Sequence, residues 1–189
     1  MVYQISLYGE NGKLINRKTI TRSPEEFGDA HLVLDIDFKI SGKAEAARLE
    51  ISSVDPYYRV TAMETTDVIL LAEGEEEIKS ILYLYADMVI QQPIPSTLIQ
   101  GNKLFVQGLT RIAPDGELIV ECVNREGGQV GSGVIEVDEE DLGDGYRSFE
   151  GEIPFQVGYS SWIRVQVIAR DGIFSGIQAL SSVEVLVSP

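Results

Sequence analysis

Acidic side chains gather in three predicted loops of the second half of the chain, where they could bind a calcium ion. The candidates are Asp115, Asp138, Glu140, Asp141, Asp144 and Asp171. If strands alternate in direction through a β-sandwich, the loops at 111–116, 138–146 and 170–179 lie at one end of it. Carboxylate oxygens on loops are ligands that Ca²⁺ takes, although the spacing here does not fit an EF-hand. The alternative is a solvated acidic loop, with Asp115 and Asp171 serving only their turns.

Aromatic side chains offer a second kind of site, a carbohydrate-binding surface. The main candidate rings are those of Tyr57 and Trp162. The further candidates are Tyr58, Tyr83, Tyr85 and Tyr159. Strand parity places Trp162 on the same face as Arg164, away from the core, and therefore at least partly exposed. The alternative is that these rings pack on strand edges or at a joint between domains, because aromatic residues are ordinary in strands.

Catalysis has few candidate residues. His31 is the single histidine, so a Ser-His-Asp or Cys-His catalyst would have to use it, and no Gly-x-Ser-x-Gly motif is present. Cys122 alternates with Leu118 and Val120, which predicts a buried small hydrophobe rather than a nucleophile. Paired carboxylates carry no specificity among 30 acidic residues. The glycines at 127–133 lack the Lys-Ser/Thr of a phosphate-binding loop. We therefore expect no enzyme and no cofactor, with Ca²⁺ as the one candidate ion.

The net charge of −15 excludes some classes of partner. The chain has 15 basic residues among 30 acidic ones. Binding to nucleic acid or to an anionic membrane surface needs clustered Lys and Arg, which are absent here. No apolar run is long enough to insert into a membrane. Proteins remain as a class of partner.

The elements that would position these residues are β-strands. The clearest spans residues 160–174, where Ile163, Val165, Val167 and Ala169 alternate with more polar residues before the Asp171-Gly172 turn. Similar alternation recurs at 104–107, 118–122, 148–153 and 183–187. Short strands separated by turn signals predict an all-β fold built as a sandwich.

The first half of the chain has the same style. Asn11-Gly12 predicts a hairpin within residues 3–20. Residues 32–40 alternate between apolar and charged side chains, which predicts a further strand. Asp55-Pro56 marks a turn before a short strand near Val60. The continuous apolar run at 68–72 predicts a separate strand that is covered on both faces.

A domain boundary is predicted at Gln91-Gln92-Pro93-Ile94-Pro95, because two prolines make a stiff, extended joint. Residues 74–90 fit either a helical stripe or a strand, and the β-rich surroundings favour extended structure. The chain is therefore predicted to hold two tandem immunoglobulin-like β-sandwiches. The first spans residues 1–90, and the second spans residues 91–189.

Several short motifs follow one another in the second half. They are Gln92-Pro93, Ile99-Gln100-Gly101, Leu104-Phe105-Val106-Gln107-Gly108, Asp115-Gly116, the stretch from Tyr146 through Phe149-Glu150-Gly151 to Phe155, and Val167-Ile168-Ala169-Arg170-Asp171-Gly172. With these motifs, residues 93–187 resemble the immunoglobulin-like domain associated with bacterial sporulation and spore germination proteins. Ile168-Ala169 stands where that family often has Ser-Ala. Residues 1–90 resemble no family that we can name.

The resemblance implies a setting and a role rather than a reaction. The family occurs in bacterial lipoproteins and other envelope proteins, and it offers no catalytic residues to transfer. It implies a non-catalytic, extracytoplasmic module that is structural or that binds proteins or other components of the cell envelope. It also implies that a segment outside this chain anchors the module to the membrane. The alternative is a ligand-binding module for carbohydrate or Ca²⁺.

Overall fold

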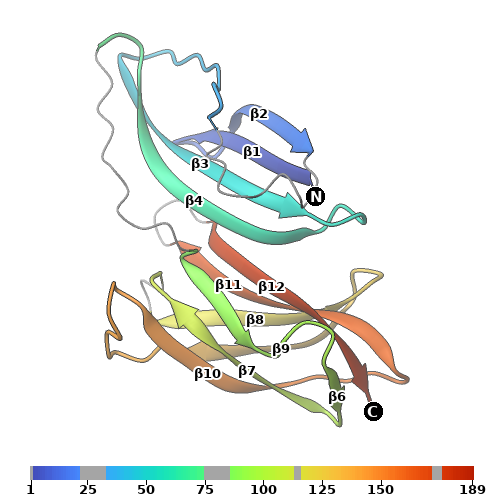
Figure 1. Cartoon of the computed structure of the whole chain (residues 1–189). Coiled ribbons are helices and arrows are strands. Elements are labelled where there is room, and N and C mark those ends of the chain that lie inside the picture. Colours follow the sequence, from blue (N-terminus) through green and yellow to red (C-terminus); the bar gives the residue numbers. More distant parts are fainter. Residues whose placement is uncertain (1, 22–32, 75–85, 113–115, 172–175) are drawn as a thin grey trace. The chain divides into compact units, whose positions relative to one another are not determined.

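The computed structural model describes residues 2–21, 33–74, 86–112, 116–171 and 176–189. The described residues form strands and no helix, which confirms the predicted all-β class. The chain divides into two compact units, Met1–Tyr85 and Ala86–Pro189 (Figure 1). The predicted division between residues 90 and 91 falls inside β5 (Met88–Gln92), which belongs to the second unit because it pairs with β7 (Lys103–Thr110).

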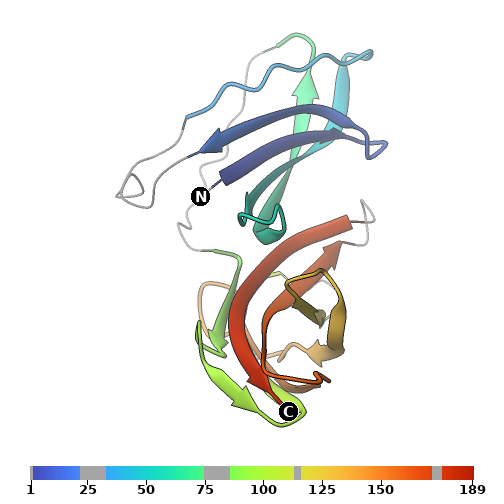
Figure 2. The same ribbon diagram turned by 90° about the vertical axis from the view of Figure 1, so that its right-hand side faces the viewer.

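Unit 1 contains an antiparallel sheet of four strands in the order β2-β1-β3-β4. The strands are β1 (Val2–Gly9), β2 (Leu14–Thr21), β3 (Ala44–Val54) and β4 (Val60–Leu71). The hairpin predicted at Asn11-Gly12 joins β1 to β2, the two blue strands of Figure 2. Gly12 takes a φ of 72° and donates its amide to the carbonyl of Gly9 at 2.9 Å. Only glycine adopts this conformation without a Cβ penalty.

The prediction of a strand at residues 32–40 is wrong for its described part, because residues 33–40 belong to no strand. Side chains of β2 bond to this segment instead of a backbone ladder. Asn16 Nδ2 donates to the carbonyl of Asp37 at 2.6 Å, and Lys18 Nζ donates to that of Asp35. Ile36 and Ile40 still pack on a small core cluster of the unit. The alternation therefore indicated which side chains face the core. It did not indicate that the backbone of this segment pairs with a neighbouring strand.

The two strands predicted between residues 58 and 72 are one continuous strand, β4. The expectation that residues 68–72 are covered on both faces is also wrong, since Ile69 is 73% exposed and Leu71 is 43% exposed. The described residues of unit 1 make one sheet. A second layer, and with it a tandem pair of immunoglobulin-like sandwiches, stays a prediction.

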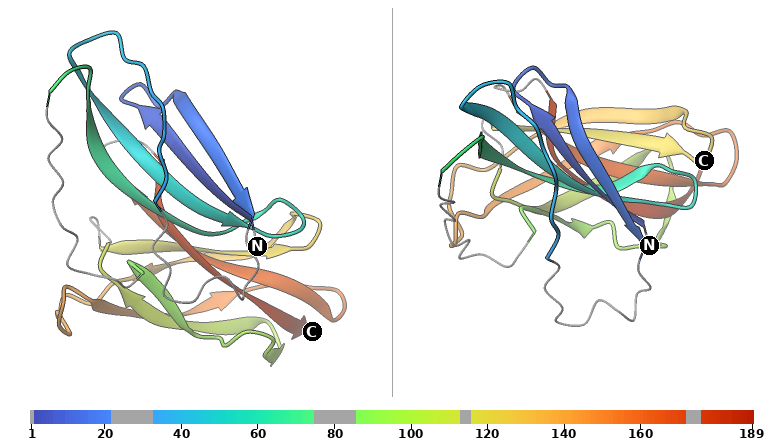
Figure 3. Two further views of the ribbon diagram at one scale, coloured as in Figure 1. Left: turned by 45° about the horizontal axis from the view of Figure 1, so that its top comes forward. Right: turned by 90° about the horizontal axis from the view of Figure 1, so that it is seen from above.

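Unit 2 packs two antiparallel sheets face to face. One has the order β12-β11-β8-β9, with β6 parallel to β12, and the other has the order β10-β7-β5. Its further strands are β6 (Leu98–Gln100), β8 (Glu117–Asn124), β9 (Gln129–Glu136), β10 (Arg147–Pro154), β11 (Ser161–Asp171) and β12 (Gly176–Ser188). The long pair β11 and β12 runs through the unit as the orange and red ribbons of Figure 3.

The core of unit 2 consists of the residues whose alternation predicted the strands. Ile163, Val165, Val167 and Ala169 of β11 are all fully buried. They lie in one cluster with Leu104, Val106, Leu118, Val120, Cys122, Phe149, Ile153, Val183, Val185 and Val187. Cys122 is the predicted small hydrophobe, and its burial raises the pKa of its thiol to about 12.

Glycine allows two close approaches inside this unit. Gly108 of β7 lies under the ring of Phe149 on β10 and against the carbonyl of Val89 on β5, so a Cβ there would overlap both. Gly131 of β9 forms a bridge with Phe155, where a Cβ would overlap the backbone of Pro154 and Phe155. The glycines at 127–133 therefore include one that brings β9 to the end of β10.

Candidate functional site

The strongest candidate site is the turn between β3 and β4, residues 55–59, which we call the tyrosine turn. The carboxylate of Asp55 holds it together from within. Asp55 Oδ1 accepts the backbone amides of Tyr57 at 2.8 Å and Arg59 at 3.0 Å. The backbone closes the same loop, because Tyr58 donates its amide to the carbonyl of Asp55 at 2.9 Å and Asp55 donates to that of Arg59 at 3.0 Å. An aspartate that bonds backbone amides two and four residues on stabilises a tight turn.

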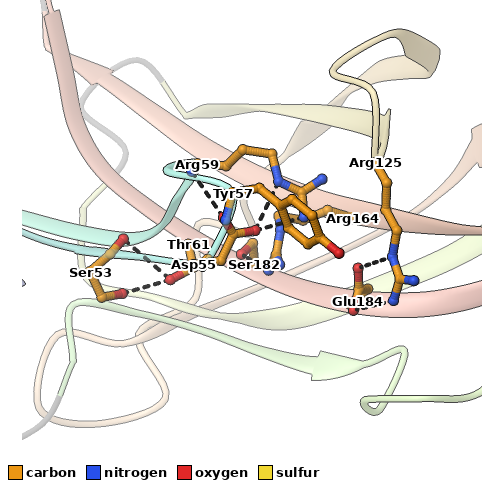
Figure 4. A network of polar contacts seen from close by, with 9 residues as sticks. All are labelled: Ser53, Asp55, Tyr57, Arg59, Thr61, Arg125, Arg164, Ser182 and Glu184. Atoms are coloured by element: carbon orange, nitrogen blue, oxygen red, sulfur yellow. Dashed lines mark hydrogen bonds and ion pairs between the residues drawn. The ribbon is translucent and has the colours of Figure 1, made fainter. Parts of the chain in front are cut away.

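The side chain of Arg59 completes the turn (Figure 4). Its Nε donates to Asp55 Oδ2 at 2.8 Å, and its Nη2 lies 2.6 Å from the same oxygen. The Asp55 side chain is 8% exposed and that of Arg59 is 17% exposed, so solvent screens this pair only weakly. The guanidinium carbon of Arg59 lies 5.2 Å from the centroid of the Tyr57 ring, within the range of a cation–π contact.

These contacts set the charge state of Asp55. Burial alone would raise the pKa of this carboxyl. The hydrogen bonds from the Arg59 amide, the Arg59 side chain and the Tyr57 amide outweigh burial, together with the Arg59 charge, and they lower the pKa below its ordinary value. Asp55 is therefore ionised at neutral pH, which is the state in which it can accept all of these bonds.

The turn presents two aromatic rings to solvent. Tyr57 is 61% exposed and Tyr58 is 85% exposed. Tyr58 has a φ of 61°, a strained value for a residue with a Cβ, and the bonds to Asp55 hold the backbone in that conformation. Below the turn, Ser53 Oγ and Thr61 Oγ1 lie 2.7 Å apart across the two strands. Fixed, exposed tyrosines can bind a partner with little loss of conformational entropy.

A row of polar side chains crosses the sheet of unit 1. Arg17 Nε donates to Ser6 Oγ at 2.9 Å, and Arg48 Nε donates to Asp67 Oδ1 at 2.9 Å. Glu50 lies opposite Ser6 in the register of β1 and β3. Burial raises the pKa of Glu50, and this outweighs the opposing charges of Arg17 and Arg48. Nothing in the sequence predicted this row, because strand register alone brings its members together.

The predicted calcium ligands have local roles where the structure describes them. Asp138 Oδ2 accepts a hydrogen bond from Ser148 Oγ, and Asp141 Oδ1 accepts the amide of Gly143 at 2.8 Å. Glu140 and Asp144 are exposed. Asp115 and the side chain of Asp171 lie outside the described residues. Within the described part of the chain, no three acidic, histidine or cysteine side chains converge as a metal site, so Ca²⁺ stays a prediction.

The described residues of two predicted loops, 111–116 and 138–146, lie close to each other. Val137 donates its amide to the carbonyl of Gly116 at 2.7 Å, next to the acidic loop. The guanidinium carbon of Arg111 lies 4.9 Å from the centroid of the Tyr146 ring. Of the third predicted loop, 170–179, residues 172–175 are not described, and the residues on either side of them belong to β11 and β12.

Trp162 lies on the face of β11 that also carries Arg164, and it is half-buried, as strand parity predicted. The guanidinium carbon of Arg125 lies 5.4 Å from the centroid of its rings, and Arg125 Nε lies 3.3 Å from Glu184 Oε1 of β12. Arg164 Nη1 donates to Ser182 Oγ at 3.2 Å on the same face (Figure 4). Arg125 therefore occupies a position over Trp162 that a stacking sugar ring would need.

The remaining candidate aromatic residues are described only in part. Tyr159 is 76% exposed in the loop before β11. Tyr83, Tyr85 and His31 lie outside the described residues. A depression of about 440 Å³ on unit 2 is lined by Asn102, Val130, Pro154, Phe155 and Gln156, and none of these five is a nucleophile or a general base.

The sequence was compared with protein-family models and with curated proteins. No protein-family model matches the sequence. No curated protein matches it either. Among the described residues, no helix is long and apolar enough to cross a membrane.

Proposed function

We propose that this chain is a non-catalytic module of a bacterial envelope protein, placed outside the cytoplasm, and that it binds other proteins. The observation that carries the proposal is the tyrosine turn. A single carboxylate, that of Asp55, holds its backbone through hydrogen bonds, and Tyr57 and Tyr58 are exposed on it. Tyrosine is enriched where proteins meet, since it offers a large contact area with few rotatable bonds.

Two further features support this role. The net charge of −15 favours encounter with a basic partner surface and disfavours acidic ones. The resemblance of residues 93–187 to a module of bacterial envelope proteins supports the extracytoplasmic setting. Carbohydrate is the competing ligand, because the same two rings could stack on a sugar.

The test uses a photoactivatable amino acid at position 58 in cells that produce the protein in its natural setting. We expect an adduct whose added mass belongs to a second protein, identified by mass spectrometry of its peptides. Asp55→Ala should reduce its yield about tenfold, the effect of ~1.4 kcal/mol of lost preorganisation. The same probe at position 159, another exposed tyrosine, is the matched control.

Two results would contradict the proposal. Equal adducts at positions 58 and 159 would mean that exposure alone produces them. An adduct removed by glycosidase, together with binding to a glycan array that Tyr58→Ala abolishes, would assign the turn to carbohydrate instead.

A further inference from the structure

Strand β6, close to the start of unit 2, runs parallel to the last residues of β12. β6 pairs with the last residues of β12 in parallel, with Leu98 opposite Leu186, Val187 opposite Ile99 and Ser188 opposite Gln100. Backbone bonds extend the contact at both ends. Ser96 donates to the carbonyl of Glu184 at 2.9 Å, and Gly101 donates to that of Ser188 at 3.0 Å. Between them, Leu186 donates to the carbonyl of Thr97 at 3.0 Å.

This arrangement decides how tension along the chain would act. The chain enters unit 2 ahead of β6, and it leaves after β12. In a parallel pair, a pull on the start of one strand and on the end of the other acts along the strand axis. The backbone bonds across the pair are then loaded together, in shear, whereas a pair pulled from adjacent ends opens one bond at a time. We propose that unit 2 resists tension along the chain through the pairing of β6 with β12.

Both strands of this pair are anchored in the unit. β12 pairs with β11 along residues 176–187, and its Val185 and Val187 are fully buried. On the β6 side, Ile99 packs against the same core cluster. Sliding β6 along β12 would therefore break backbone bonds and expose apolar surface in one step.

The point at which the chain enters the unit is also fixed. Tyr146 Oη donates to the carbonyl of Ala86 at 2.7 Å. Arg111 Nη2 lies 2.8 Å from Asp87 Oδ1, and the Arg111 amide donates to the carbonyl of Asp87 at 2.8 Å. Tension from the preceding residues thus meets these contacts and the β5–β7 pairing before it reaches β6.

The inference deepens the proposed role of an envelope module and rests on it. Unit 2 comes under tension when a partner is bound at the tyrosine turn of unit 1 and the chain is anchored on the C-terminal side of unit 2. The two proposals nevertheless have separate readouts. Loss of the adduct at position 58 would leave the mechanical result intact, and a mechanically weak unit 2 would leave the adduct intact.

The experiment is single-molecule force spectroscopy on the whole chain, pulled in two directions at one loading rate. In the first, handles are attached at both termini. In the second, they are attached at Tyr159→Cys and at the C-terminus, which are adjacent ends of the antiparallel β11–β12 pair, since Ser161 lies opposite Val187. Cys122 is buried, so it does not compete for the handle chemistry. With handles at both termini, unit 2 is identified by the greater length of chain that residues 86–189 release than residues 1–85. With one handle at position 159, only residues 159–189 of unit 2 lie between the handles, so the event is identified by their shorter release.

We expect unit 2 to unfold at a clearly higher force when pulled by its termini than when pulled from position 159. At one constant force between the termini, Ile99→Pro should raise the unfolding rate by roughly tenfold, because proline removes a ladder amide and forced unfolding follows the unfolding rate. The matched control is Val134→Pro in the edge strand β9, which lies off the loaded pair. This variant should leave the unfolding rate at that force nearly unchanged. Equal forces in the two directions would overturn the proposal even if Ile99→Pro failed to fold.

Discussion

At the residue scale, one carboxylate determines the shape of the candidate site. Asp55 accepts two backbone amides and the Arg59 guanidinium, and it does so with an 8% exposed side chain. These bonds keep Tyr58 at a positive φ. The position of the two tyrosines therefore depends on the backbone conformation that Asp55 stabilises. The ring of Tyr57 also contacts the guanidinium of Arg59.

Asp55→Asn should change the dependence of stability on pH. The pKa of Asp55 in the folded protein lies below its ordinary value of 3.8. Its contribution is thus fully present above the unfolded-state pKa and is lost as the pH falls through the folded-state pKa. We expect denaturant unfolding to show a deficit for Asp55→Asn of about 1–2 kcal/mol at pH 7, since a charge-assisted bond is replaced by a neutral one. The deficit should shrink as the pH falls below 4.

The control for this titration is Asp144→Asn, at an exposed position in the acidic loop. If the Asp55→Asn deficit were the same at pH 3 and pH 7, the ion pair with Arg59 would not be what stabilises the turn.

Glu50→Gln should behave in the opposite way. Burial raises the pKa of Glu50 in the folded state, so its contribution to stability is present below the unfolded-state pKa and is lost as the pH rises through the folded-state pKa. Removing the charge is therefore expected to stabilise unit 1 at pH 7, by no more than about 1 kcal/mol. The gain should vanish near pH 4. A destabilised variant at pH 7 would show that attraction to Arg17 and Arg48 outweighs burial.

At the element scale, close approach between neighbouring strands shapes unit 2. β7 lies between β5 and β10, and at Gly108 both neighbours come within reach of the position that a Cβ would occupy. The ring of Phe149 fills the space over that glycine. The sheet can therefore bury a large aromatic residue without displacing β5.

Gly108→Ala should destabilise unit 2, because its Cβ would overlap the Phe149 ring and the carbonyl of Val89. The expected cost is about 1–3 kcal/mol in the free energy of unfolding, typical of overpacking in a core. Gly158→Ala, whose Cβ would meet no atom within 4 Å, is the matched control. The measurement is the midpoint of chemical denaturation. Equal midpoints for the two variants would contradict the packing described for Gly108.

At the scale of the whole molecule, the described residues of the two units form hydrophobic clusters of different size. Unit 2 has a continuous cluster with members on strands of both of its sheets. The cluster described for unit 1 contains three buried residues, Leu7, Ala47 and Leu70, with partly buried neighbours. Because apolar burial is the dominant favourable contribution to folding, unit 2 should be the more stable of the two.

A fragment of residues 86–189 should therefore fold by itself. We expect a dispersed amide NMR spectrum and a single cooperative melting transition, with a midpoint close to that of the later transition of the whole chain. The fragment of residues 1–85 should melt at a lower temperature or fail to fold. A collapsed spectrum for residues 86–189 would refute the assignment of an independent core to this unit.

The sequence by itself determined the class of the fold and most of the core of unit 2. Alternation with a period of two identifies side chains that share a face. The apolar side chains that it identified at 104–107, 118–122, 148–153, 163–169 and 183–187 are buried. It also identified the hairpin at Asn11-Gly12 and the turn at Asp55-Pro56, because local conformational preference suffices there. The partly exposed position of Trp162 followed from the same parity.

Only the tertiary structure decided which strands pair and which polar groups meet. Alternation at residues 33–40 does not distinguish a paired strand from an extended segment whose carbonyls bind side chains of β2. The sequence shows Asp55 and Arg59 four residues apart, but the hydrogen bond between their side chains depends on the path of the turn. The parallel contact of β6 with β12 joins residues far apart in the chain, and no local pattern encodes it. Register is a property of two strands together, so one strand's sequence does not determine it.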